Sequence, residues 1–325
     1  MRKLSFLPVT LLASLAACSG GGGNSDPPGA AATTTNGAAA SAEISNTNPA
    51  GPTGSISGTA TVSGYSFGDC NPCNEENIAN STGASSVSWT KDNNFNPQSL
   101  TINATENGAA FSKSFDLTQA VQGDNGLFTV ASGDGSLLYY AGAAEPVGTN
   151  GDTSLDYMTF GLWAVDGGTG GQVGVFSAGQ ETPTSKMPTT GTATYSGSTV
   201  GTMYVVADPT NNNNSSSYSL VGTSNATADF GAHSVNGSVA LSTSGGSTNT
   251  AWSQTMNFNG AITGNQFAGS TSLTASKSDA LNAGNMAGAV AGSFYGPSAP
   301  SEIGGTYNLS GTNASILGAF GARMH

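Results

Sequence analysis

The feature that most constrains the fold is a series of short segments in which apolar residues alternate with small polar ones. In residues 252–258 the apolar residues share one face of an extended chain, with Ser253, Thr255 and Asn257 on the other. Such alternation is typical of strands with one buried face. About eight such segments follow Thr192 at a spacing of roughly 10–20 residues. This predicts a closed antiparallel barrel or a sandwich, and closure would remove exposed sheet edges.

Strand-length segments also fill the amino-terminal half. They are rich in aromatic and β-branched residues, lie between Gly, Asn and Asp, and comprise residues 56–62, 86–89, 100–102, 110–115, 127–130, 137–140 and 157–163. Residues 177–190 carry Pro183 and Pro188 without alternation, which indicates a boundary. We therefore predict a mainly all-β protein with a β-rich domain over residues 54–180. An eight-stranded antiparallel β-barrel is expected over residues 187–325.

The composition suits an exported β-protein and argues against nucleic-acid binding. Gly provides 47 of the 325 residues and charged residues only 8%, a pattern that favours tight turns over a helical cytoplasmic enzyme. The formal net charge is −12. Removal of residues 1–17 would make it −14, because that segment contains Arg2 and Lys3 and no acid. Nucleic acid and anionic lipid would repel such a chain.

The first residues resemble a bacterial lipoprotein signal peptide. Arg2 and Lys3 precede an apolar run that is too short to span a bilayer. The run ends in Leu-Ala-Ala-Cys at residues 15–18, which resembles a lipobox. Cys18 would then be the lipidated residue after cleavage behind residue 17. An ordinary signal peptide with an incidental cysteine is the alternative.

A polar segment separates this signal from the first predicted strand. Residues 18–53 consist almost wholly of Gly, Ala, Ser, Thr, Asn and Pro, so we predict a disordered tether. A tether of about 35 residues spans roughly 30–35 Å on average. Ser19, in place of an acid, favours sorting of the lipid anchor to the outer membrane, and attachment to the membrane is expected through that anchor.

Several runs in the carboxyl-terminal half resemble the β-barrel domain of the transferrin-binding protein B family of surface lipoproteins. They are Gly-Thr-Ala-Thr-Tyr-Ser-Gly at 191–197, Ala-Asp-Phe-Gly at 228–231, Phe-Asn-Gly-Ala-Ile at 258–262, Gly-Ser-Phe-Tyr-Gly-Pro at 292–297, Glu-Ile-Gly-Gly-Thr-Tyr at 302–307 and Gly-Ala-Phe-Gly-Ala-Arg at 318–323. Phe294 and Phe320 suit a barrel interior, and Tyr295 and Tyr307 suit packing between strands. Residues 157–163 resemble the end of the handle domain that precedes the barrel in that family.

The resemblance implies a handle-like domain and a barrel at the cell surface that bind haem, or a host protein carrying haem or iron, for nutrient acquisition. The family's namesake has two such lobes, whereas this sequence has room for one. It is therefore more similar to smaller single-lobe relatives, some of which bind haem or haem proteins. We expect no enzyme activity and no resident cofactor, with haem considered only as a bound ligand.

Cys70 and Cys73 are the two cysteines other than Cys18. A structural disulfide is favoured in an oxidising envelope. A redox pair would need a βαβ context that the pattern lacks, and a zinc site would need two further ligands.

His233, Tyr139 and Tyr140 are the candidate ligand-binding residues. A histidine ring or a tyrosinate can ligate haem iron. An exposed loop position for His233, and strand-face packing for the tyrosines, are the alternatives. No metal site is expected, because Asp124, Asp134, Asp152 and Asp166 lack calcium-loop spacing.

Two other functions remain open at the level of sequence. A structural or adhesive surface lipoprotein with no small ligand is the main alternative to iron or haem capture. An envelope hydrolase would depend wholly on His233, and no Gly-x-Ser-x-Gly strand–turn–helix context supports it.

Overall fold

A computed structural model describes residues 56–62, 64–66, 83–91, 97–106, 109–123, 127–142, 155–166, 171–206, 215–246, 251–276 and 279–325. Within these residues the chain forms eighteen β-strands and two three-residue 3-10 helices. The protein is thus mainly all-β, as its alternating pattern predicts. The expected signal peptide, the tether, Cys18, Cys70 and Cys73 all lie outside the described residues.

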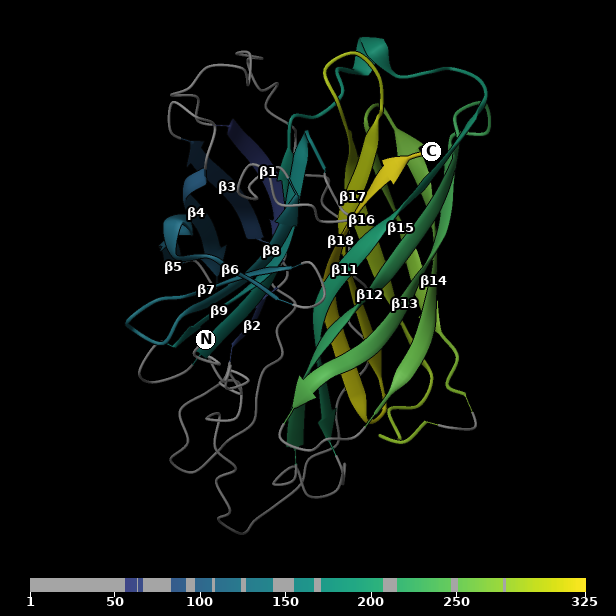
Figure 1. The fold of residues 1–325 in the computed structure, drawn as a ribbon. Helices are drawn as coiled ribbons and strands as arrows, with labels where there is room; N and C mark the ends of the chain where they lie inside the picture. Colours follow the sequence, from purple (N-terminus) through teal and green to yellow (C-terminus); the bar gives the residue numbers. More distant parts are fainter. Residues whose placement is uncertain are drawn as a thin grey trace, which may run out of the picture.

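The amino-terminal half forms two antiparallel sheets (Figure 1). The first sheet has the order β1-β3-β4-β5. Its strands are β1 (Ile56–Val62), β3 (Gly83–Lys91), β4 (Pro97–Glu106) and β5 (Ala109–Asp116). A 3-10 helix, η1 (Leu117–Gln119), follows β5 and is capped by the Asp116 carboxylate, which accepts from the Thr118 N–H at 3.0 Å. Asp116 thereby ends the strand and starts the crossing to the second sheet.

The second sheet has the order β2-β10-β9-β8-β7-β6. Its strands are β2 (Gly64–Ser66), β6 (Val121–Gln122), β7 (Phe128–Ala131), β8 (Leu137–Gly142), β9 (Met158–Asp166) and β10 (Gly171–Gly179). The sequence pattern does not predict β10, because its buried residues interrupt simple alternation. Val175 and Phe176 are adjacent and both fully buried, so both faces of this strand are covered.

The two sheets pack face to face around one apolar core. Its buried members are Val87, Trp89, Leu100, Ile102, Phe115, Leu117, Phe128, Val130, Leu138, Tyr140, Trp163, Phe176 and Ala178. Glycine makes room for the largest rings, because a Cβ on Gly174 would lie 2.4 Å from the Trp163 ring and one on Gly161 would lie 2.7 Å from Phe176. These pairs place bulky rings across the sheet from residues without side chains.

The carboxyl-terminal half forms a closed eight-stranded antiparallel barrel, which confirms the predicted architecture (Figure 1). Its strands are β11 (Thr192–Val206), β12 (Ser215–Asp229), β13 (Ser234–Gly246), β14 (Ser253–Thr263), β15 (Gln266–Leu273), β16 (Met286–Tyr295), β17 (Glu302–Gly311) and β18 (Ala314–Met324). Closure is achieved by β18 pairing with β11, with Tyr195 opposite Met324 and Val205 opposite Ala314.

Side chains fill the barrel interior. Phe320 packs against Phe258 and Phe267, with ring centroids 5.4 and 6.4 Å apart. Phe294 is also fully buried in this core, so both phenylalanines lie inside the barrel as predicted. Tyr307 points inward as well, and Gly318 makes room for it, since a Cβ there would lie 2.3 Å from the Tyr307 ring.

One short helix lies in the connection from the second sheet to the barrel. This is η2 (Thr184–Lys186), between β10 and β11. In the described part of the chain, no helix is both long and apolar enough to cross a membrane.

Candidate functional site

The second sheet lies between the first sheet and the barrel, so its central strand β9 is buried on both faces. Gly161 and Trp163 face the first sheet, whereas Phe160 and Leu162 face the barrel. On the barrel side, β18 is also buried on both faces from Ala314 to Ala322. A strand buried on two faces marks a contact between layers, here between the sheet and the barrel wall.

We call this contact the sheet–barrel interface. Its buried apolar residues are Leu127, Ala141, Leu155, Met158, Phe160, Leu162, Val173, Val175, Val200, Tyr295, Leu317 and Ala319. The barrel contributes two glycines at the closest approach. A Cβ on Gly304 would lie 2.2 Å from the Met158 methyl, and one on Gly321 would lie 2.6 Å from the Phe160 ring. The glycines that suit barrel strands thus also let the second sheet approach closely.

Glu302 joins the two halves by accepting three backbone hydrogen bonds. The N–H of Asp156 donates to Oε1 at 2.6 Å, and those of Tyr157 and Met158 donate to Oε2 at 3.0 and 3.1 Å. The side chain is 1% exposed. Three donors at the start of β9 are therefore satisfied by one carboxylate from the start of β17, which fixes the position of the sheet on the barrel.

Burial raises the pKa of Glu302 to about 7, although the three backbone donors act to lower it. The negative charge of Asp156 nearby also raises this pKa. Asp156 itself forms an exposed ion pair with Arg323 at 3.1 Å, which contributes little to stability. The carboxyl of Glu302 is thus a buried acid at the centre of the joint, and near neutral pH it is only partly ionised.

The connection between the halves is also fixed by hydrogen bonds. Glu181 accepts from the Ser293 hydroxyl at 2.8 Å and from the Asn265 amide at 3.0 Å. Its backbone forms a bridge to Tyr295, at the end of β16. The Tyr295 hydroxyl lies 3.0 Å from the Ser177 hydroxyl on β10. Because Tyr295 is paired with Glu302, these contacts and those of Glu302 hold the halves together at the same end of the apolar interface.

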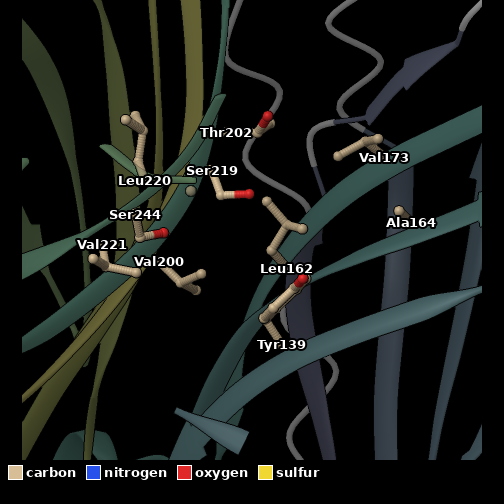
Figure 2. A pocket seen from close by; sticks show the side chains of 11 residues that line it. Tyr139, Leu162, Ala164, Val173, Val200, Thr202, Ser219, Leu220, Val221 and Ser244 are labelled. Carbon is tan, nitrogen blue, oxygen red and sulfur yellow. The ribbon is translucent and has the colours of Figure 1, made fainter. Parts of the chain in front are cut away.

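A cleft opens along one edge of the sheet–barrel interface. Its lining residues come from β8, β9 and β10 on one side and β11, β12 and β13 on the other: Tyr139, Leu162, Ala164, Val173, Val200, Gly201, Thr202, Ser219, Leu220, Val221 and Ser244. Its empty volume is about 430 Å³, including the part open to solvent. Figure 2 shows Leu162 and Tyr139 facing Val200 and Val221 across the opening. This cleft is the candidate binding site.

A β-bulge shapes the barrel wall of the cleft. In the β12–β13 pairing, Ser219 is opposite Gly245 and Leu220 is opposite Thr243, so Ser244 has no partner in the register. A bulge re-aims a side chain and bends its strand, and bulges are common beside binding sites. Here it places Ser244 at the exposed rim of the cleft.

The structure separates the three ligand-binding candidates. Tyr139 is half-buried and lines the cleft, where burial raises the pKa of its hydroxyl. Tyr140 points to the opposite face of β8, is fully buried in the core between the sheets, and packs on Phe128 at 5.6 Å between ring centroids. His233 is exposed in the turn between β12 and β13, with φ of 51°, and does not line the cleft.

These placements give haem ligation little support. A ligand in the cleft reaches Tyr139 alone of the three, and burial favours the neutral phenol over the tyrosinate that would ligate iron. Within the described ranges, no group of three or more His, Cys, Asp or Glu side chains could hold a metal ion.

Sequence reasoning singled out Tyr139 but missed the other elements of the site. Glu302 appeared only within a family-like run, and Ser244 and Ala164 carried no signal. An acid between Ser301 and Ile303 at the start of a strand looks like an ordinary solvated residue. Only the contact with residues 156–158, across about 145 positions of sequence, shows its role.

The fold defines a class of protein in which a two-sheet β region is joined to a closed eight-stranded antiparallel barrel. Residues 187–324 match the family model described as the C-lobe and N-lobe β-barrels of Tf-binding protein B. The match covers the whole barrel and less than half of the chain. The carboxyl-terminal barrel is therefore similar to the barrels of transferrin-binding protein B.

Solved structures of related architecture are similar at low identity. A mutant of transferrin binding protein B from Haemophilus parasuis is 13% identical with a TM-score of 0.43, and the match covers 84% of this chain and 76% of that one. Isotype 1 of the protein from Neisseria meningitidis is 14% identical with a TM-score of 0.41, covering 82% and 58%. HpuA from Kingella denitrificans, solved with human haemoglobin, is 16% identical with a TM-score of 0.39, covering 86% and 89%.

At these identities and TM-scores the solved structures carry no argument about function. No curated protein matches this sequence significantly.

Proposed function

We propose that this chain is a non-catalytic surface lipoprotein that captures an iron-carrying host protein for nutrient acquisition. The observation that carries the proposal is the match of residues 187–324 to the barrels of transferrin-binding protein B. That family is named for binding an iron carrier. The lipobox-like run ending at Cys18 supports attachment to the outer membrane, with the barrel displayed at the cell surface.

The packed core of the barrel supports a protein ligand held on the outside. Aromatic side chains pack the interior around Phe294 and Phe320, which favours a ligand held outside the barrel. The residues that line the cleft include no positive group that could pair with the propionates of haem. A host protein that carries iron or haem therefore fits the described surface better than free haem does.

Capture can be measured with the full chain displayed on bacterial cells. Labelled iron-loaded transferrin, haemoglobin and haemin are titrated separately, and bound label is counted by flow cytometry. We expect saturable binding of at least one iron-carrying protein, with Kd of about 1 μM or tighter. Serum albumin serves as the protein control, and a Cys18→Ser variant should lose both display and capture.

The proposal fails if an antibody detects the chain on the cells while none of the iron-carrying proteins binds, and binding of haemin alone would make free haem the ligand instead. Binding of the same cells to extracellular matrix depleted of iron and haem proteins would then favour the adhesive alternative.

A further inference from the structure

We propose that the sheet–barrel cleft receives an uncharged apolar side chain, about one aromatic ring in size, from the protein that this chain captures. The identity of that partner rests on the proposed function. The chemistry of the cleft is independent of it and comes from the described residues alone.

The lining of the cleft defines the charge of the occupant. None of the eleven lining residues is an acid or a base that is ionised at neutral pH. Burial raises the pKa of Tyr139, so its hydroxyl remains neutral and able to donate a hydrogen bond. An ionised group placed here would lose its hydration without gaining a partner of opposite charge. The cleft therefore selects a neutral group.

The size and openness of the cleft favour a side chain over a whole small molecule. The empty volume of about 430 Å³ counts all the space up to bulk solvent, so the part that the walls enclose is much smaller. Sites for drug-sized ligands span roughly 300–1,000 Å³ and cover 70–90% of the ligand. The enclosed part of this cleft falls well below that range, which suits one side chain that projects from a larger body. Protein interfaces commonly place aromatic anchors in such pockets.

The floor of the cleft continues the apolar core of the sheet–barrel interface. Val200, Leu162 and Val173 belong to that core, and Tyr139, Ala164 and Val221 pack against it while only partly buried. An apolar ring in the cleft would cover these exposed parts and extend the core outwards. Both halves contribute walls, so the shape of the cleft depends on how the second sheet packs on the barrel.

The barrel segment that continues from the cleft at β13 through β15 has no ionised acid or base, although the molecule as a whole is strongly acidic. Residues 230–276, which include β13, β14 and β15, contain no Asp, Glu, Lys or Arg. Exposed positions there are mostly Ser, Thr and Asn, such as Ser253, Thr255 and Asn257 on β14. A partner anchored in the cleft would meet a neutral polar surface. Its binding should then depend only weakly on salt.

Two cleft variants and one matched control test the inference. Ala164→Leu adds apolar volume and fills the cleft, whereas Val221→Thr keeps the shape and adds a hydroxyl. Ala268→Leu is the matched control. It makes the same substitution as Ala164→Leu, but at an exposed position of β15 that does not line the cleft. Each variant is made in the full chain, with far-ultraviolet circular dichroism to check the fold.

Two measurements are made on each variant. Titration with N-phenyl-1-naphthylamine, a neutral apolar fluorophore, reports on the cleft itself, using chain with Cys18→Ser so that no acyl group is attached. Titration with the captured iron-carrying protein reports on docking. We expect Ala164→Leu to weaken the affinities for the fluorophore and for the captured protein by about tenfold or more. Val221→Thr should weaken both affinities by about threefold, and Ala268→Leu by less than about twofold.

The results distinguish failure of the cleft inference from failure of the docking role and of the proposed function. Equal fluorophore binding by the natural chain and Ala164→Leu overturns the inference, whatever the partner does. Fluorophore loss with unchanged partner affinity overturns the docking role but leaves the proposed function standing. Fluorophore binding in a chain that captures no iron-carrying protein refutes the proposed function and assigns the cleft to a free apolar molecule instead.

Discussion

The barrel interior and the sheet–barrel interface are both apolar, but they are built differently. The interior is a closed core of aromatic rings. Phe267 and Phe294 come from the neighbouring strands β15 and β16, and Phe320 on β18 contacts Phe258 and Phe267 across the barrel interior. The interface joins segments far apart in sequence and is fixed at one end by polar contacts, above all those of the buried Glu302. It also stays open along one edge.

The difference shows which region can serve recognition. A filled core excludes ligands and supplies stability, whereas an interface with an open edge presents apolar surface in a fixed shape. Four predictions would break or sharpen this comparison, and they follow in order of decreasing expected effect.

The largest effect is expected from Phe320→Ala in the barrel interior. The substitution removes a fully buried ring that contacts Phe258 and Phe267 and leaves a cavity, which should cost about 3–5 kcal/mol of the free energy of unfolding. Urea denaturation followed by tryptophan fluorescence measures it. A loss below about 1 kcal/mol would show that the interior is loosely packed.

Glu302→Ala should have the next largest effect. It leaves the backbone N–H groups of Asp156, Tyr157 and Met158 without their acceptor, at a cost of about 2–4 kcal/mol. The barrel interior is untouched, so we expect calorimetry to show the amino-terminal sheets melting before the barrel. A single unshifted transition would mean that Glu302 does not hold the joint.

The pH dependence of stability should report on the same carboxyl. Because its folded-state pKa is raised to about 7 from 4.5, the native state binds more protons than the unfolded state between these values. Stability is then greatest below the unfolded pKa and falls as pH rises through the folded pKa, by about 1–3 kcal/mol between pH 5 and 8. Glu302→Gln provides the control, since it lacks this carboxyl. Equal pH profiles for the two proteins would refute the assignment.

The smallest effects concern two tyrosine hydroxyls. Tyr307 in the barrel lies 2.8 Å from the Thr199 hydroxyl, and Tyr295 at the interface lies 3.0 Å from that of Ser177. Thr199→Val should cost about 1–2 kcal/mol, and Ser177→Ala about 0.5–1, because Ser293 still hydrogen-bonds Tyr295. Thermal denaturation of both variants measures the two losses of stability. A larger loss for Ser177→Ala than for Thr199→Val would contradict the prediction.

Much of the fold could be predicted from the sequence because period-two alternation is a local signal. This alternation predicted the barrel strands and the interior positions of Phe294 and Phe320. It could not show that Tyr295 and Tyr307 face different sides of the barrel wall, since both were expected to pack between strands. Tyr307 lies inside the barrel, whereas Tyr295 faces the second sheet. That distinction depends on which outer barrel surface the second sheet covers, and alternation does not encode it.

The site was less predictable, because its parts meet only through tertiary contacts. Residue type alone drew attention to Tyr139, Tyr140 and His233, and the fold brings just Tyr139 to the cleft. The other wall comes from Val200 and Val221, which read as ordinary strand residues. Cys18, Cys70 and Cys73 remain predictions of the sequence.

The most direct test of the whole account is a structure of the full chain bound to the iron-carrying protein that it captures. The account predicts an apolar side chain of that protein seated between Leu162 and Val221, with the partner covering both the second sheet and the barrel wall. A complex in which the partner contacts only the ends of the barrel, with the cleft empty, would contradict it.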